Sequence, residues 1–127
     1  MILTRTDDGF SVVFAHEEEH DLIPLRIDAL VGITINAKSL LVIGLEVNSF
    51  MWAMKHQHGI EPDISGLPGN ARYFTREGVL AINLAARPGE PPVRDVLIDG
   101  CDVLVTQHME LAGIRVGCPS YLKLATG

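Results

Sequence analysis

The densest run of apolar residues in the chain covers residues 39–58 and includes the only tryptophan, Trp52. A segment this apolar belongs in a core or in a subunit interface, because its exposure to water is unfavourable. Two interpretations of its pattern compete. If the whole run is one helix, apolar side chains three and four residues apart line one face, namely Leu40, Ile43, Val47, Phe50 and Met54.

The alternative is a strand followed by a short helix. Asn48 and Ser49 would then cap a helix that runs from Phe50 to about His58. Gly44 favours this alternative, because a glycine in a helix interior costs roughly 1 kcal/mol against alanine. We therefore expect a strand and then a helix. The strand would carry apolar residues on one face at every second position, namely Leu41, Ile43, Leu45 and Val47.

Two hairpins are predicted where short turn signals separate apolar runs, because Asp-Gly and similar pairs suit a tight turn between antiparallel strands. Between the hairpins, the mostly apolar residues 22–35 predict one or two strands, and Pro24 excludes a helix at their start. The predicted hairpins are residues 2–6 and 10–15 around Asp7-Asp8-Gly9, and residues 71–75 and 79–84 around Arg76-Glu77-Gly78.

A third turn of the same kind is predicted at Asp99-Gly100, between strands at residues 93–98 and 101–106. The alternative at this place is a short helix over residues 93–98 that leads into a strand at residues 103–106. Ala112-Gly113 is a further turn signal near the end of the chain.

Glycine and proline are dense in residues 59–70, which predicts a long loop, and again in residues 87–92. Loops of this length often carry function. Turn signals at this spacing, with β-branched residues between them, predict an α+β, β-rich fold, a mostly antiparallel sheet built from hairpins with one or two short helices. The length of 127 residues predicts a single domain, residues 1–127.

The charge balance argues against two classes of partner. Ten basic against sixteen acidic residues give a net charge of −6, and no two basic residues are adjacent. We therefore expect no binding to nucleic acid or to an anionic membrane, since both need clustered Lys and Arg. No apolar run reaches the ~18 residues of a membrane span, and the start lacks a signal-peptide pattern. With only two cysteines, the sequence predicts a reduced, cytoplasmic protein.

The segment His16-Glu17-Glu18-Glu19-His20 matches the H-E-x-x-H pattern of zinc hydrolases. On a helix, His16 and His20 would bind zinc and Glu17 would activate water. However, the preceding Val12-Val13-Phe14 favours a strand, and the acidic interior leaves no apolar flank to bury the site. We therefore expect a solvated acidic connection, and a metal-dependent hydrolase is the alternative. The candidates for a third ligand are Glu46, Asp63 and Glu110.

Two further groups carry chemistry only if the fold arranges them. His56 and His58 end the predicted helix, where the helix dipole favours imidazole without any further role. Because His56 and His58 lie beside the long loop, each is also a candidate general base or metal ligand. Cys118 precedes Pro119, and a helix beginning there would stabilise its thiolate, with His108 as a partner. Because His108 falls inside an expected strand, a buried and inert cysteine is the preferred interpretation.

Two functional hypotheses follow. The first is a non-catalytic interaction module that acts as a homodimer, because a mean hydropathy of +0.24 in a short chain leaves apolar surface for a partner to cover. Its acidic face would meet a basic protein partner or keep the dimer soluble. No glycine motif for nucleotides or phosphate occurs, so no cofactor is indicated. The alternative is a small-molecule-binding protein or enzyme with a pocket formed by Trp52, His56, His58, Tyr73 and Arg72.

Overall fold

The computed structural model describes residues 1–14, 18–85 and 93–125. Within them, eight strands form one antiparallel sheet in the order β1-β2-β8-β7-β3-β4-β6-β5. They are accompanied by the helix α1 (Phe50–His58) and a 3-10 turn, η1 (Glu19–Asp21). The predicted α+β, β-rich fold is confirmed. The strands are β1 (Ile2–Arg5), β2 (Gly9–Val13), β3 (Ile23–Asn36), β4 (Val42–Val47), β5 (Ala71–Phe74), β6 (Val79–Asn83), β7 (Val93–Val105) and β8 (Leu111–Gly117).

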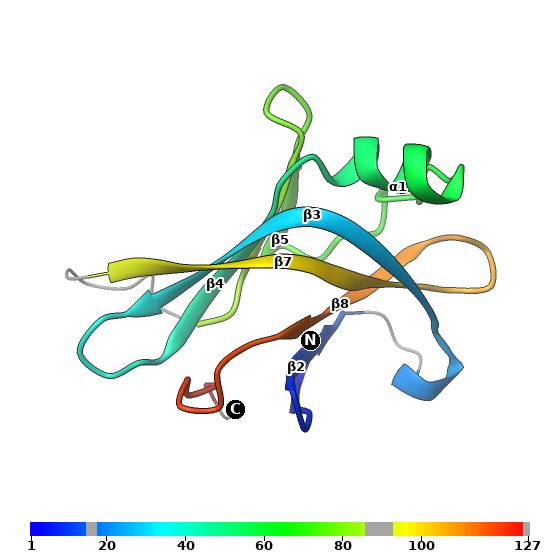
Figure 1. Ribbon diagram of the computed structural model, residues 1–127. Coiled ribbons are helices and arrows are strands. Elements are labelled where there is room, and N and C mark those ends of the chain that lie inside the picture. Colours follow the sequence, from blue (N-terminus) through cyan, green and yellow to red (C-terminus); the bar gives the residue numbers. More distant parts are fainter. Residues whose placement is uncertain (15–17, 86–92, 126–127) are drawn as a thin grey trace.

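The sheet bends into half a barrel around the main apolar core (Figure 1). The two longest strands, β3 and β7, pair along nearly their whole length. Alternate residues of β3 point into the core, where Val31, Ile33 and Ile35 are fully buried. Phe50 and Met54 of α1 are buried against the same core. Each buried side chain of this size contributes about 1.5–3 kcal/mol relative to its exposure.

Residues 39–58 contain a strand followed by a helix, as predicted, but the helix begins differently. Neither expected capping side chain caps it. Ser49 adopts a left-handed conformation with φ of 51°, and its side chain makes no hydrogen bond to the helix. The side-chain amide of Asn48 donates to the main chain of β3 at 3.0 Å. The Phe50 N–H donates to the Gly78 carbonyl at 3.0 Å, so the turn between β5 and β6 takes the place of a cap.

A register shift between β3 and β4 changes which residues of β4 are buried. Leu45 and Val47 are buried, as the alternating pattern predicts. Ile43 is not, because the pairing shifts at Ile35 and brings Val42 into the core in its place. The prediction of Ile43 on the buried face is therefore wrong, and this side chain lies partly exposed on the outer face of the sheet.

Two predicted turns are wrong, because the glycines in them lie inside strands. Asp99-Gly100 falls within β7, which also excludes the alternative helix over residues 93–98. Gly100 has φ of +80° in a bulge opposite Ile27, and a Cβ there would lie 2.8 Å from the Ile27 carbonyl oxygen. Gly113 falls within β8, where a Cβ would lie 2.3 Å from the carbonyl oxygen of Val12.

The remaining predicted connections hold. β1 and β2 form one hairpin and β5 and β6 another, and residues 59–70 form the long loop between α1 and β5. The turn between β7 and β8 lies at residues 106–110, so His108 lies in a turn and not in the expected strand. Residues 87–92 lie outside the described residues. Among the residues that are described, no helix is long and apolar enough to cross a membrane.

Candidate functional site

Large apolar side chains are exposed on the outer face of β3 and β7. Leu97 is 63% exposed, and Leu30 and Val93 are each 46% exposed. Acidic residues alternate with them along β7, because every second residue of a strand points to the same face. Leu30 lies on β3, opposite Asp99 of β7. We define the outer-face patch as the three apolar residues Leu30, Val93 and Leu97 with the three carboxylates Glu46, Asp95 and Asp99.

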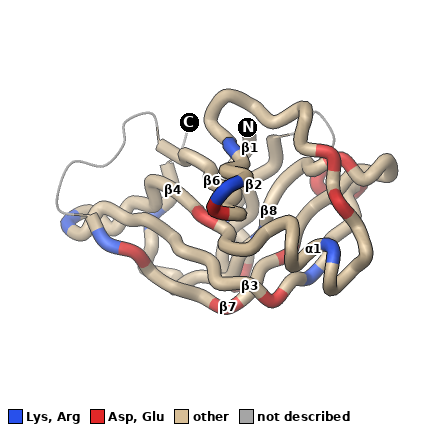
Figure 2. Tube along the Cα trace, turned by 90° about the horizontal axis from the view of Figure 1, so that it is seen from above, with Lys and Arg blue, Asp and Glu red and all other residues tan. Residues whose placement is uncertain are grey.

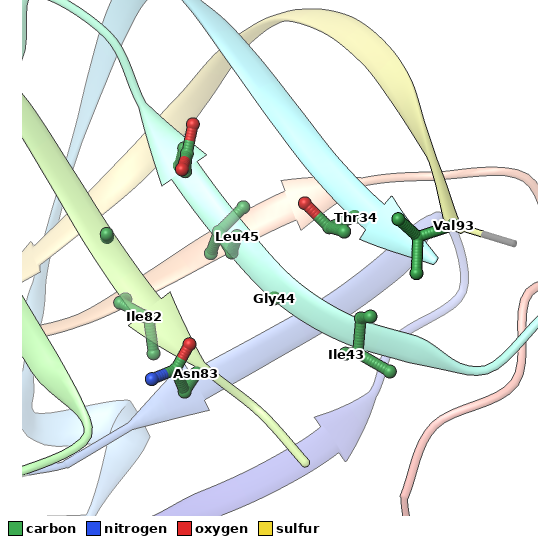
Figure 3. Close-up of a pocket in the computed structure, with 9 residues that line it drawn as sticks. Thr34, Ile43, Gly44, Leu45, Ile82, Asn83 and Val93 are labelled. Carbon is green, nitrogen blue, oxygen red and sulfur yellow. The ribbon is translucent and has the colours of Figure 1, made fainter. Parts of the chain in front are cut away.

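The patch has a flat floor, because small residues occupy the strand positions between its side chains. Gly32 lies opposite Leu97 on one side and opposite Glu46 on the other, and Ala81 follows on the next strand. Gly44 continues this floor on β4, beside a cavity of about 250 Å³. A bound chain can therefore approach the main chain of the sheet closely. Around Gly44, Figure 3 shows the side chains of Thr34, Ile43, Asn83 and Val93.

Within the described residues, the carboxylates of the patch form no ion pair, and the nearby guanidinium of Arg26 donates to the main-chain carbonyl of Asp99 at 3.1 Å. Glu46, Asp95 and Asp99 are exposed, and the ion pairs of the described residues include none of the three. The Thr34 hydroxyl donates to Asp95 at 2.9 Å, which orients the carboxylate without neutralising it. Acidic positions recur along β7 at the outside of the sheet (Figure 2). This part of the surface therefore attracts positive charge.

A second polar group on the outer face is paired internally. The guanidinium of Arg115 lies 3.6 Å from Glu19 of η1 and 3.1 Å from Asp102 of β7. Glu19 also accepts a hydrogen bond from the fully buried hydroxyl of Ser11 at 2.5 Å. Arg26 lies 3.8 Å from the other oxygen of Asp102. Because these carboxylates have cations, unlike those of the patch, this group holds η1 against the sheet.

The residues of the predicted small-molecule pocket fall into three places. Trp52 is 60% exposed and stacks on His56 with ring centroids 4.3 Å apart. Trp52 and Tyr73 line one open depression. The ring of His58 instead donates to the main chain of β3 at 2.6 Å. The guanidinium carbon of Arg72 lies 4.9 Å from the centroid of the Phe74 ring, and Arg72 does not line the depression. The fold thus gathers Trp52, His56 and Tyr73, but neither His58 nor Arg72.

The H-E-x-x-H segment is only partly described. His16 and Glu17 lie outside the described residues. His20 belongs to the 3-10 turn η1, where its ring is exposed and lies 3.5 Å from the carboxylate of Asp21. Among the residues that the structure describes, no three His, Cys, Asp or Glu side chains gather in an arrangement that would hold a metal ion.

The three candidate third ligands lie in two separate places. Glu46 belongs to the outer face of β4. Asp63 and Glu110 are joined by an isolated main-chain bridge between the long loop and the start of β8. The carboxylate of Asp63 accepts the N–H of Ser65 at 2.9 Å, which lowers the pKa of Asp63 below its usual value. Asp63 thus serves a local turn of the loop.

Both cysteines are free thiols. Cys101 is fully buried on β7, and burial raises the pKa of its thiol to about 12. Burial also raises the pKa of the half-buried Cys118, although the nearby guanidinium of Arg5 opposes this shift. A raised pKa lowers the fraction of thiolate, which is the reactive form.

Comparison of the chain with models of known families, with curated proteins and with solved structures finds no match. Sequence reasoning missed the outer-face patch. Its signal was present, because apolar and acidic residues alternate from Val93 to Asp99. The alternation predicts a strand with two unlike faces, but not that the apolar side chains of this strand point outward.

Proposed function

We propose that the protein is an interaction module that binds a basic segment of a partner protein through the outer-face patch. The exposed apolar side chains carry this proposal, above all Leu97, because a side chain of this size that water surrounds in the single chain gains free energy when a partner covers it. The carboxylates beside it supply the charge preference.

The spacing of the patch suggests the form of the partner segment. Along β7 the outward positions are Val93, Asp95, Leu97 and Asp99, two residues apart. An extended peptide has the same period, so basic residues on either side of an apolar one can reach Asp95 and Asp99 while the apolar residue contacts Leu97. Arginine suits this surface, because its guanidinium forms two parallel hydrogen bonds to a carboxylate.

A second copy of the chain fits this face less well than a basic partner. Face-to-face pairing would bring the carboxylates of one patch near those of the other, and like charges oppose association. Basic residues of the same sheet face are already engaged: Arg72 stacks on Phe74, and Arg26 and Arg115 lie beside Asp102. The homodimer that the sequence suggests remains a prediction, which sedimentation of the chain at micromolar concentration tests.

The proposal is tested with a fluorescently labelled peptide in which arginine and leucine alternate at every second position with serine between them (Arg-Ser-Leu-Ser-Arg-Ser-Leu), so that both residue types lie on the same face of the extended chain. We expect saturable binding by fluorescence anisotropy and weaker binding at high salt. In NMR spectra, the backbone amide resonances of β7 should change their chemical shifts when the peptide is added. Leu97→Ser and the double variant Asp95→Asn/Asp99→Asn should each weaken binding at least tenfold. Tyr121→Ser, another exposed apolar position, serves as the matched control. Equal binding of a glutamate–leucine peptide, or unchanged affinity in the β7 variants, contradicts the proposal.

A further inference from the structure

A second surface, separate from the outer-face patch, carries an aromatic platform. Trp52 projects from α1 with 60% of its surface exposed. One face of the indole stacks on His56, with an angle of 21° between the rings. The Nδ1–H of His56 donates to the carbonyl of Trp52 at 3.0 Å, which fixes the imidazole under the indole. The platform is therefore held in place before any ligand arrives, which reduces the entropic cost of binding.

The platform borders an open depression of about 460 Å³ between α1 and the turn that joins β5 to β6. Two contacts fix these elements relative to each other. The Phe50 N–H donates to the Gly78 carbonyl at 3.0 Å, and the rings of Phe50 and Tyr73 pack edge to face with centroids 6.2 Å apart. The volume is within the range of small-molecule sites, and the walls belong to packed elements. Apart from Trp52 and Gly78, the lining is Ser49, Tyr73, Thr75, Arg76 and Glu77.

The chemistry of this lining favours a ligand without net charge. It contains one cation, Arg76, and one anion, Glu77, so that a phosphate would meet the carboxylate and an ammonium group would meet the guanidinium. The hydroxyls of Ser49 and Thr75 both donate and accept hydrogen bonds. A surface with hydrogen-bonding groups of both kinds around an exposed aromatic face suits a ring with one apolar face and a rim of hydroxyls.

We propose that this depression is a saccharide-binding site, in which the pyranose ring stacks on Trp52 and its hydroxyls bond to Arg76, Glu77 and Thr75. The depression is open, so it admits a terminal sugar of a longer chain as well as a free monosaccharide. The inference does not rest on the outer-face patch, because the two surfaces share none of these residues.

Trp52 is the only tryptophan, so its fluorescence reports on this site alone. We expect a saturable change in its emission with at least one of glucose, galactose, N-acetylglucosamine, maltotriose and chitotriose. Arg76→Gln and Glu77→Gln should each raise the dissociation constant at least fivefold. Trp52→Ala should abolish binding in calorimetry, and Tyr121→Ala, which removes another exposed aromatic ring, should leave binding unchanged. Thermal unfolding of each variant verifies that it is folded.

Three results would overturn the inference. One is the absence of any saturable change with all five sugars. Another is binding that the Arg76→Gln and Glu77→Gln variants retain in full. The third is a fluorescence response to inorganic phosphate or to choline that is stronger than the response to every sugar, because it would assign the site to a charged ligand.

Discussion

The side chain of Gln57 pairs with the main chain of Asp28 as a neighbouring strand would. The Asp28 N–H donates to the side-chain carbonyl of Gln57 at 2.8 Å, and the side-chain amide donates back to the Asp28 carbonyl at 3.0 Å. His58 donates to the Arg26 carbonyl at 2.6 Å in the same way. β4 pairs with β3 only from Val31 onward, so the end of α1 covers the edge of β3 that lacks a strand.

Loss of this substitute pairing should destabilise the protein. Gln57→Ala removes both hydrogen bonds, and each is worth about 0.5–1.5 kcal/mol, so we expect a loss of about 1–3 kcal/mol. The midpoint of urea unfolding measures this loss. Gln107→Ala is the matched control, because Gln107 is exposed in the turn between β7 and β8. Equal midpoints for the two variants would show that the pairing contributes nothing to stability.

Alanine at two glycines should separate backbone strain from steric overlap. Gly59 and Gly100 both have positive φ, at 69° and 80°. A Cβ at Gly59 meets nothing within 4 Å, whereas one at Gly100 lies 2.8 Å from the Ile27 carbonyl oxygen. We expect Gly59→Ala to cost about 1 kcal/mol and Gly100→Ala clearly more, measured by thermal and urea unfolding. Similar costs would mean that the bulge in β7 relaxes freely.

The side chains of Glu19 and Ser11 should contribute to stability in a coupled, non-additive way. Removing its carboxylate by Glu19→Ala leaves the buried Ser11 hydroxyl without an acceptor and Arg115 with one partner fewer, so a cost of about 1–3 kcal/mol is expected. Ser11→Ala in the same background should then cost less than it does alone. A double-mutant cycle from urea unfolding gives this coupling energy. Strictly additive costs would refute the contact between Ser11 and Glu19.

Stability should fall at alkaline pH because of Cys101. The pKa of its thiol rises from 9.0 in water to about 12 in the fold, so only the unfolded chain releases this proton between these values. The contribution of the neutral Cys101 thiol to the free energy of unfolding is fully present below pH 9. It declines as the pH rises toward 12, by at most about 1.4 kcal/mol per pH unit. Urea unfolding from pH 7 to 11 measures the slope. Cys101→Ala should be less stable at neutral pH but should lose stability less steeply as the pH rises. An equal slope in this variant would show that Cys101 does not cause the alkaline loss of stability.

The sequence predicted elements whose signals are local. The strand-then-helix division of residues 39–58 followed from Gly44, and the two hairpins followed from turn residues between apolar runs. The turns predicted at Gly100 and Gly113 failed for a physical reason. Glycine provides positive φ in a bulge or room for a neighbouring strand as readily as it makes a turn, and only the partner strand distinguishes these cases.

The burial of large apolar residues was less predictable, because burial depends on the rest of the fold. Trp52 lies in the most apolar run, yet it points away from the core face of α1 that carries Phe50 and Met54. Ile43 points outward because of a one-residue register shift, which reverses the faces of a strand. The candidate site residues Trp52, His56 and Tyr73 are gathered by the contact of α1 with the β5–β6 hairpin, a contact that no short pattern encodes.

The pairing of β2 with β8 and of β3 with β7 joins the two ends of the chain. On the ribosome, the first three strands emerge well before β7 and β8 are synthesised. During this interval β3 can pair only with β4, and its other edge is open to misfolding or to chaperones. Pairings between residues so distant in sequence also form slowly. A nascent chain stalled before residue 93 should therefore remain sensitive to protease, and resistance should appear only after β8 has left the exit tunnel.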